Sequence, residues 1–275
     1  MEAKKRKGIV LLALLGLLLF AGCTQGPGTG QKESLSIAGS TTVQPIAANA
    51  AEEYMADNPN IAVSVSGGGS GTGIKMVSEG STDIGTSSRD LTADEISSAG
   101  LKVYPIANDG VAIIVNPANT LTDLTKQQIK DIFSGKIKNF KEIGGPDKEI
   151  VVIIRESGSG TRTSFEDMIM DKGKTNNTES AEQQSSNGSV KASVAGNPNA
   201  IGYVGAGYVD ATVKALKVAG IEATKETIKS VTYPISRKLY MITKGEAMGK
   251  TKDFIDYVLS DKGQSIVEEE GFVRL

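Results

Sequence analysis

The 275-residue sequence contains no histidine and no tryptophan, and aromatic residues make up only 5% of it. Histidine titrates near neutral pH and is the commonest protein ligand of metal ions, so acid–base chemistry and metal binding through histidine are excluded. Serine-nucleophile motifs of the Ser-x-x-Lys and Gly-x-Ser-x-Gly types are absent, as are carboxylates at metal-ligand spacing. The sequence therefore argues against an enzyme and predicts neither a metal nor a cofactor.

Cysteine is nearly absent as well: Cys23 is the only one, so no disulfide can form within the chain. The segment before it is built like an export signal, with four cations in Met1–Lys7 and an apolar stretch over Gly8–Gly22. This stretch has 15 residues, fewer than the ~20 that a helix needs to cross a bilayer core. We expect residues 1–22 to be a signal peptide.

The end of this segment, Phe20-Ala21-Gly22-Cys23, resembles a lipobox, although Phe20 stands where leucine is usual. In a lipobox the cysteine is lipidated and becomes the new N-terminus. We therefore expect Cys23 to anchor the chain to the outer face of the cytoplasmic membrane, with a simply cleaved signal or an uncleaved anchor as alternatives. Residues 23–34 lack apolar periodicity and predict a flexible tether.

A large excess of charge of either sign is also lacking. Without residues 1–22 the chain has 26 basic and 31 acidic residues, a net charge of −5. A mildly acidic body argues against nucleic acid or an anionic lipid surface as partner. If the chain binds an anion, the attraction must be local.

Strand-like and helix-like apolar patterns alternate from Leu35 to the C-terminus, which predicts an α/β fold. Capping boxes at Thr92 and Thr125 mark the start of two helices. The expected strands are 35–39, 61–65, 103–106, 111–115, 150–154, 213–218 and 239–243, with a turn at Asn108-Asp109-Gly110 and a polar surface excursion over 176–188.

The tripeptide Tyr-Pro-Ile occurs twice, at Tyr104–Ile106 and at Tyr233–Ile235, each time leading into an expected strand. Two matching crossovers indicate two lobes joined by paired strands, with the C-terminal helices returning to the first lobe. Coincidence is the alternative.

Three segments share one pattern, a strand that breaks into Ser, Thr and Gly just before a helix: Gly39–Val43, Ser66–Gly73 and Arg155–Glu166. Such a start directs unpaired amides, hydroxyls and the positive end of the helix dipole at one spot, which suits a small anion. The plain alternative is a set of ordinary turns. No Gly-Lys-Ser/Thr follows and Gly-x-Gly-x-x-Gly is not matched, which argues against nucleotide binding.

These three segments, with D-I-G-T-S-S-R at Asp83–Arg89 and N-A-I-G-Y-V at Asn199–Val204, resemble the phosphate-binding lipoproteins of phosphate-uptake ABC transporters. The resemblance implies a two-lobed periplasmic-binding-protein fold of type II, in which each lobe is a mixed sheet flanked by helices and two hinge strands connect the lobes. It places residues 35–106 and 235–275 in the first lobe and residues 107–234 in the second. It also implies capture of inorganic phosphate by a monomer and delivery to a membrane permease.

Carried over residue by residue, the resemblance implies phosphate contacts from Thr41, Thr42, Ser70, Ser88, Arg155, Ser159, Gly160 and Thr161. Ser40, Gly71 and Ser87 flank these positions and are second choices. Arg89 and Arg162 are either further contacts or structural ion-pair partners.

One departure concerns selectivity, because some members of the family carry aspartate where Ser88 and Ser157 stand here. The first of these aspartates accepts the proton of hydrogen phosphate and repels sulfate. Glu156 is not expected to replace it, because successive strand side chains point to opposite faces. The other candidate carboxylates are Asp83, Asp90 and Asp109. Sulfate, arsenate, tungstate and molybdate therefore stay open as ligands, and a phosphomonoester hydrolase or a structural surface lipoprotein stay open as other classes.

Overall fold

The computed structural model describes residues 32–275, and the predicted signal peptide, Cys23 and most of the predicted tether lie outside them. Strand β1 begins at Glu33, two residues before the predicted strand start at Leu35. The last two residues of the predicted tether, Glu33 and Ser34, therefore belong to this strand. Among residues 32–275, no helix is both long and apolar enough to cross a membrane.

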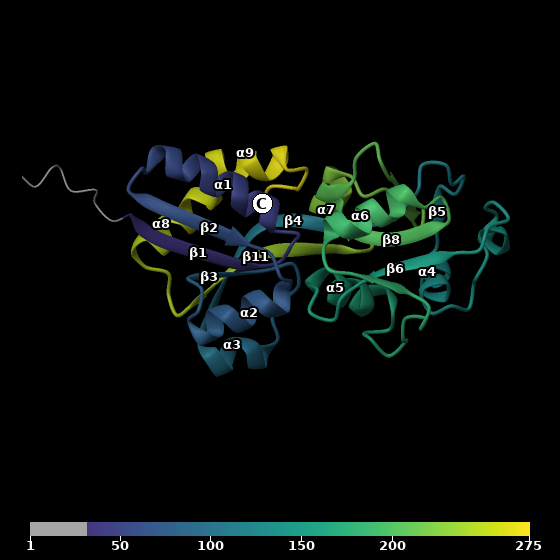
Figure 1. Cartoon of the computed structure of the whole chain (residues 1–275), viewed down its shortest axis with the longest axis horizontal. Helices are drawn as coiled ribbons and strands as arrows, with labels where there is room; N and C mark the ends of the chain where they lie inside the picture. Colours follow the sequence, from purple (N-terminus) through teal and green to yellow (C-terminus); the bar gives the residue numbers. More distant parts are fainter. Residues whose placement is uncertain (1–31) are drawn as a thin grey trace, which may run out of the picture. The chain divides into compact units, whose positions relative to one another are not determined.

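One mixed sheet of nine strands runs through the described chain in the order β2-β1-β3-β11-β4-β8-β6-β7, with β9 beside β4 (Figure 1). The pairs β1–β2, β1–β3, β6–β8 and β6–β7 are parallel, and β11 is antiparallel to both β3 and β4. A separate parallel pair joins β5 and β10. The strands are β1 (Glu33–Gly39), β2 (Ile61–Ser66), β3 (Ile84–Ser87), β4 (Leu101–Val115), β5 (Asp123–Leu124), β6 (Val151–Arg155), β7 (Glu182–Gln184), β8 (Ala200–Gly205), β9 (Lys214–Ala215), β10 (Lys217–Val218) and β11 (Ser236–Lys244).

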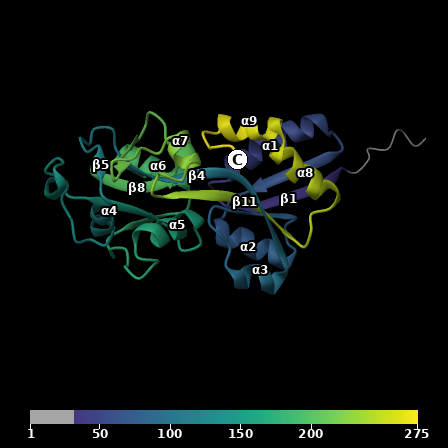
Figure 2. The ribbon, with the colours of Figure 1, turned by 180° about the vertical axis from the view of Figure 1, so that it is seen from behind.

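Helices cover the sheet at both ends of the molecule, as the two opposite views show (Figures 1 and 2). One group packs around β1–β3 and contains α1 (Gln44–Asp57), α2 (Ser70–Glu79), α3 (Ala93–Ala99), α8 (Gly249–Leu259) and α9 (Asp261–Glu269). The other lies around β6 and β8 and contains α4 (Lys126–Phe133), α5 (Gly160–Ile169), α6 (Asn187–Gly196) and α7 (Lys225–Lys229), with the short 3₁₀ helices η1 (Phe140–Ile143) and η2 (Ala206–Tyr208).

Two apolar cores divide the described chain into two lobes. The first core gathers Leu35, Ile46 and Phe254 with their neighbours, and the second is built around Phe133 and Phe165. Phe165 stacks on Tyr203 with ring centroids 4.3 Å apart. We call these the first lobe and the second lobe, and the predicted two-lobed α/β architecture is confirmed.

Strands β4 and β11 connect the two lobes. Ile106 and Ala107 of β4 lie in the first core, whereas Val111 and Ile113 of the same strand lie in the second. Strand β11 begins directly after Ile235, which belongs to the second core, and continues into the first. The predicted boundaries at 106/107 and 234/235 thus fall on or beside these strands, and the numbers themselves stay a prediction.

The predicted turn at Asn108-Asp109-Gly110 is wrong, because β4 continues unbroken through these residues. Gly110, Asp109 and Asn108 pair in register with Ser236, Arg237 and Lys238 of β11. The turn-forming composition is overridden by this ladder and by an ion pair between Asp109 and Arg237. Tertiary pairing outweighs the weak local preference of such residues.

Two other local predictions need correction. The single strand expected at 213–218 is two short strands, β9 and β10, which pair with β4 and β5 respectively. The surface excursion expected at 176–188 contains β7 and ends within the first turn of α6, whose first residue, Asn187, is fully buried. By contrast, the capping boxes at Thr92 and Thr125 are confirmed.

Helix α2 approaches the sheet so closely that Gly73 leaves no room for a side chain. A Cβ there would lie 2.7 Å from the Ala38 carbonyl oxygen and 2.8 Å from the Thr86 carbonyl oxygen. We expect Gly73→Ala to lower the free energy of unfolding by about 1–3 kcal/mol, because backbone atoms cannot move aside as a flexible side chain can. Urea denaturation measures this.

The matched control is Gly196→Ala at the end of α6, where an added Cβ meets nothing within 4 Å. This variant should be as stable as the wild type or slightly more stable. Equal stability of the two variants would contradict the close approach of α2 to the sheet.

Candidate functional site

Helices α1 and α2 of the first lobe lie toward α5 and α6 of the second (Figure 1). Polar residues from both lobes meet at this boundary. Several hydrogen bonds cross the boundary there. The Oγ1 atoms of Thr42 and Thr161 are 3.0 Å apart, the Gly71 amide donates to the Gly158 carbonyl at 3.0 Å, and the Ser164 hydroxyl donates to the Ser88 carbonyl at 3.2 Å. The predicted segments therefore converge, although they lie far apart in the sequence.

The first segment contributes hydroxyl groups. Thr41 and Thr42 are buried in the turn before α1, where the Thr42 amide donates to the Ser40 Oγ at 3.2 Å and the Gln44 amide to the Ser40 carbonyl at 3.0 Å. These amides are thus engaged within the turn, contrary to the expectation of unpaired amides at this helix start. Ser40 acts as the acceptor that shapes the turn.

The second segment places Ser70 at the first position of α2, fully buried. Its Oγ accepts from the Ser88 amide at 3.0 Å and lies 3.4 Å from the Ser88 Oγ. The neighbouring Ser87 is turned away, because its hydroxyl donates to the carbonyl of Arg89 and accepts from the amide of the same residue. Ser70 and Ser88 therefore present adjacent hydroxyls, whereas Ser87 closes its own turn.

The third segment begins at Arg155, the last residue of β6, and leads into α5. Ser159 caps this helix by accepting from the Arg162 amide at 3.2 Å. The amides of Gly160 and Thr161 occupy the first two positions, where a helix offers no acceptor of its own. Only glycine fits at 160, because a Cβ would lie 2.2 Å from the Ser70 Oγ.

Arg155 is the cation of this cluster, with 1% of its surface exposed. Its Nε and Nη2 donate to the two carboxylate oxygens of Glu156 at 2.9 and 2.8 Å, and its buried Nη1 has no partner among the described residues. The expectation that Glu156 points away is wrong, because β6 ends at Arg155 and the alternation of strand side chains ends with it. An unpartnered buried donor on a charged group is costly, so its position marks where an acceptor is missing.

The other two predicted arginines, Arg89 and Arg162, are held in ion pairs. Both Nη atoms of Arg89 donate to Glu95 at 2.9 and 2.7 Å, which holds the pKa of Glu95 below its usual value. The Nε of Arg162 donates to Glu166 at 2.7 Å, and its Nη1 donates to the Arg155 carbonyl at 3.0 Å. Of the two roles left open for these arginines, the geometry favours the structural one.

The three candidate carboxylates have separate partners. Asp83 accepts from the amide and hydroxyl of Ser36, and Asp90 accepts from the Tyr240 hydroxyl. Asp109 is fully buried and accepts from Arg237 Nε and Nη2 at 2.9 and 2.7 Å. None of the three makes a hydrogen bond to Ser88, where some members of the resembled family carry aspartate.

Comparisons with known proteins show the family of the chain. Residues 24–262 match the family model of the PBP superfamily domain. The chain is 36% identical to the phosphate-binding protein PstS of Bacillus subtilis, over 98% of this chain and 94% of the relative. It is 35% identical to PstS of Borreliella burgdorferi, over 98% of this chain and 99% of the relative. The chain belongs to the PstS family of the PBP superfamily.

Solved structures of PstS-like proteins share the fold. A protein of Clostridium perfringens, assigned as a phosphate ABC transporter substrate-binding protein and solved with bound phosphate, is 43% identical, with a TM-score of 0.85 over 88% of this chain and 100% of that one. An ABC-type phosphate transport receptor of Vibrio cholerae is 35% identical, with a TM-score of 0.74 over 88% and 100% of the two chains. The predicted periplasmic-binding-protein fold and family are confirmed.

Asn187 is a residue that sequence reasoning missed in this PstS-family chain. It belongs to the second lobe, and its Nδ2 donates to the hydroxyls of Thr41 and Thr42 in the first lobe at 3.1 and 2.9 Å. A signal was present: S-S-N-G-S-V at Ser185–Val190 is another Ser/Asn/Gly helix start. The polar composition of the preceding residues concealed it.

Tyr208 was also missed, and its hydroxyl donates to the Thr41 carbonyl across the lobe boundary. Burial raises the pKa of Tyr208 to about 12, so the hydroxyl keeps its proton at physiological pH. After the hydrogen bonds of Asn187, this is a further link from the second lobe to the turn before α1, and it comes from η2.

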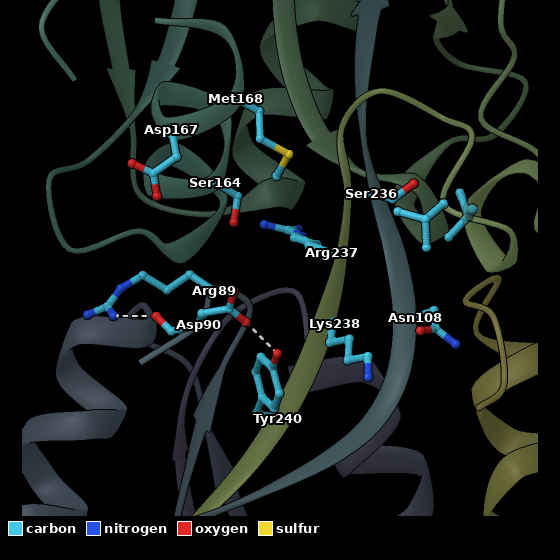
Figure 3. A pocket seen from close by; sticks show the side chains of 12 residues that line it. Arg89, Asp90, Asn108, Ser164, Asp167, Met168, Ser236, Arg237, Lys238 and Tyr240 are labelled. Carbon is cyan, nitrogen blue, oxygen red and sulfur yellow. Dashed lines mark hydrogen bonds between the residues drawn. The ribbon is translucent and has the colours of Figure 1, made fainter. Parts of the chain in front are cut away.

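A cavity of about 510 Å³ lies beside the cluster and is lined by residues of both lobes (Figure 3). Two of its lining residues contact the cluster: Ser164 donates to the Ser88 carbonyl, and Arg237 lies 3.4 Å from the Thr42 Oγ1. Of the predicted candidates, Arg89 and Asp90 are among the lining residues. The converging hydroxyls of Thr42, Ser70 and Thr161 are therefore not in this cavity but next to it.

The ionised phenol of Tyr208 is unfavourable in the folded state, so the free energy of unfolding falls at high pH. An unfolded tyrosine ionises near pH 10, whereas Tyr208 keeps its proton up to about pH 12. The stability contributed by this proton is complete below pH 10 and is lost as the pH rises toward 12. We expect urea denaturation to show a smaller loss of stability over this range in Tyr208→Phe than in the wild type, and an equal loss would contradict the assignment.

Proposed function

We propose that this protein is an extracytoplasmic solute-binding protein that captures inorganic phosphate between its two lobes and delivers it to a membrane ABC permease. The observation that carries the proposal is the fully buried Arg155 at the end of β6, directly before the helix-start amides of α5, whose Nη1 has no partner among the described residues. The proposed phosphate contacts are Thr41, Thr42, Ser70, Ser88, Arg155, Ser159, Gly160 and Thr161. The names of the relatives, and the phosphate bound to the Clostridium perfringens protein, support the same ligand.

The chemistry of these groups suits a dianion. Removing water from an ion costs on the order of tens of kcal/mol in a low-dielectric site, so nearly every oxygen lone pair needs a donor. Each hydrogen bond to a charged group returns about 1.5–3 kcal/mol, so about ten donors are needed for a usable affinity. Hydroxyls, the amides at the start of α5 and one guanidinium provide donors of all three kinds. Arginine adds a planar pair of donors in fixed geometry, which lysine lacks.

Closure of the lobes follows from the division of the donors between them. Thr41, Thr42, Ser70 and Ser88 belong to the first lobe, whereas Arg155 and the start of α5 belong to the second. An anion reaches the full set only when the lobes are in contact, so binding stabilises the closed arrangement. The permease can then distinguish loaded from empty protein by the relative position of the lobes.

Sulfate is the second candidate ligand, because a serine rather than an aspartate stands at 88 and Asp109, the one buried carboxylate among residues 32–275, is paired with Arg237. A serine hydroxyl can accept a hydrogen bond from hydrogen phosphate but does not repel an unprotonated anion. Competition titration of phosphate against sulfate at two pH values ranks the two ligands. We propose binding rather than hydrolysis, since the chain lacks histidine and the described residues hold no metal-ligand cluster.

Loss of the buried guanidinium provides the first test. We expect Arg155→Ala to weaken phosphate binding by well over tenfold, since it removes the charged donor whose Nη1 awaits an acceptor. Arg89→Ala is the matched control, because both Nη atoms of that arginine are bonded to Glu95. Isothermal titration with phosphate compares the two. Unchanged affinity in Arg155→Ala would place the site elsewhere.

The close contact at Gly160 provides a second test. A Cβ at 160 would lie 2.2 Å from the Ser70 Oγ of the opposite lobe, so Gly160→Ala should keep the lobes apart and weaken phosphate binding at least tenfold. Gly158→Ala, two residues earlier, meets nothing within 4 Å and should bind like the wild type. Thermal unfolding of both variants verifies that each lobe is folded. Wild-type affinity in Gly160→Ala would argue against closure at this contact.

We further propose that lipidated Cys23 holds a monomer at the outer face of the cytoplasmic membrane, beside its permease. In cells, Cys23→Ser should move the protein from the membrane to the soluble fraction and lower phosphate uptake, while the purified protein keeps its phosphate affinity. A Cys23→Ser variant that stays membrane-bound would count against the lipid anchor. A molar mass of two chains in light scattering of the purified protein would count against the monomer.

A further inference from the structure

The hydroxyl of Thr42 has more partners than any other in the site. Its Oγ1 lies 2.9 Å from Asn187 Nδ2, 3.4 Å from Arg237 Nη2 and 3.0 Å from Thr161 Oγ1. The amide nitrogen and the guanidinium can only donate, and a hydroxyl accepts at most two hydrogen bonds while donating one. Both lone pairs of Thr42 are therefore in use, and its proton is directed toward the second lobe.

The orientation of Asn187 is set by its own partners. Its Oδ1 accepts from the Gly205 amide at 3.1 Å, and only the oxygen of the side-chain amide can do so. The Nδ2 consequently faces Thr41 and Thr42. Because the side chain is fully buried, water does not compete for these hydrogen bonds.

Arg237 is oriented by a buried ion pair on the two connecting strands. Asp109 of β4 and Arg237 of β11 stand opposite each other in register, with side-chain exposures of 0% and 4%. The other carboxylate oxygen of Asp109 accepts from the Ala206 amide of the second lobe at 2.9 Å. Figure 3 shows Arg237 extending from β11 between the lobes, near Ser164 of α5. The pair thus connects the turn before α1, both hinge strands and the second lobe.

We propose that Asn187 and Arg237 are positioning residues that hold the Thr42 hydroxyl as an obligate hydrogen-bond donor to the bound oxyanion. In the loaded site, the acceptor of this proton is a phosphate oxygen that carries no proton itself. Thr42 cannot accept from a P–OH group, so the protonated oxygen of hydrogen phosphate must face another part of the site. The proposal rests on the proposed function, because it assigns a role at the same anion site.

A double-mutant cycle on phosphate affinity tests the proposal. In the wild-type background, Asn187→Ala should weaken binding about tenfold, because the Thr42 hydroxyl is then free to rotate. In the Thr42→Val background, which has no hydroxyl to orient, the same change should cost about twofold or less. Thr42→Ser restores the hydroxyl and should restore the full effect of Asn187→Ala. A purely structural asparagine would cost the same in all backgrounds.

The matched control is Asn116→Ala, because Asn116 is a buried asparagine of the second lobe whose Nδ2 donates to the carbonyls of Val194 and Ala195 and not to the site. It should lower stability but leave phosphate affinity unchanged. If Asn187→Ala does not fold, the cycle is run with Asp109→Asn/Arg237→Gln, which removes both buried charges together. This pair should also weaken binding in the wild type and much less in the Thr42→Val background.

The outcomes separate the two proposals. Equal costs of Asn187→Ala in the wild-type and Thr42→Val backgrounds, or wild-type affinity in Thr42→Val, would overturn the role of Thr42 as an oriented donor. In either case, a large loss of affinity in Arg155→Ala would still support phosphate binding at this site. No loss in Arg155→Ala would overturn the proposed function itself.

Discussion

The burial of Arg155 imposes the main constraint on this structure. A guanidinium that is 99% removed from solvent is stable only if its donors are paired, and Glu156 occupies just one edge of it. Its Nη1 is buried and has no partner among the described residues. Under the proposed function, a small anion accepts hydrogen bonds from this guanidinium, from the hydroxyls of the site and from the amides at the start of α5. The anion thus supplies the acceptors that the many donors of the site lack.

The two long strands β4 and β11 determine how the lobes can move when they close on an anion. Both pass from one apolar core to the other, and they pair along nine positions of β11, so the lobes are joined by a ladder rather than by a loose linker. Relative movement of the lobes must therefore bend this ladder. The ion pair between Asp109 and Arg237 lies on the ladder and reaches Thr42, which places the hinge and the binding site in direct contact.

Much of the fold could be predicted from local patterns. Strand alternation, helical spacing, and the capping boxes at Thr92 and Thr125 act over a few residues, and these predictions agree with the structure. The errors arose where distant partners prevailed. Asn108-Asp109-Gly110 has the composition of a turn, but its pairing with β11 keeps it extended. Glu156 was assigned by strand alternation to the wrong side, because the strand ends one residue earlier.

The sequence by itself determined the α/β class, the family and the short Ser/Thr/Gly segments that begin helices, because these depend on the order of neighbouring residues. Only the tertiary structure decided which hydroxyls face one another and that Asn187 contacts Thr41 and Thr42 from a segment of polar composition. It also decided that Arg155 and Arg237 each keep a buried Nη1 without a partner among the described residues, whereas Arg89 and Arg162 are paired with glutamates. Hydrogen bonds between the lobes join residues that lie far apart in the sequence, and Thr42 and Thr161 are 119 positions apart. The packing of the two apolar cores around the paired strands β4 and β11 brings such partners together, and no local sequence pattern indicates them.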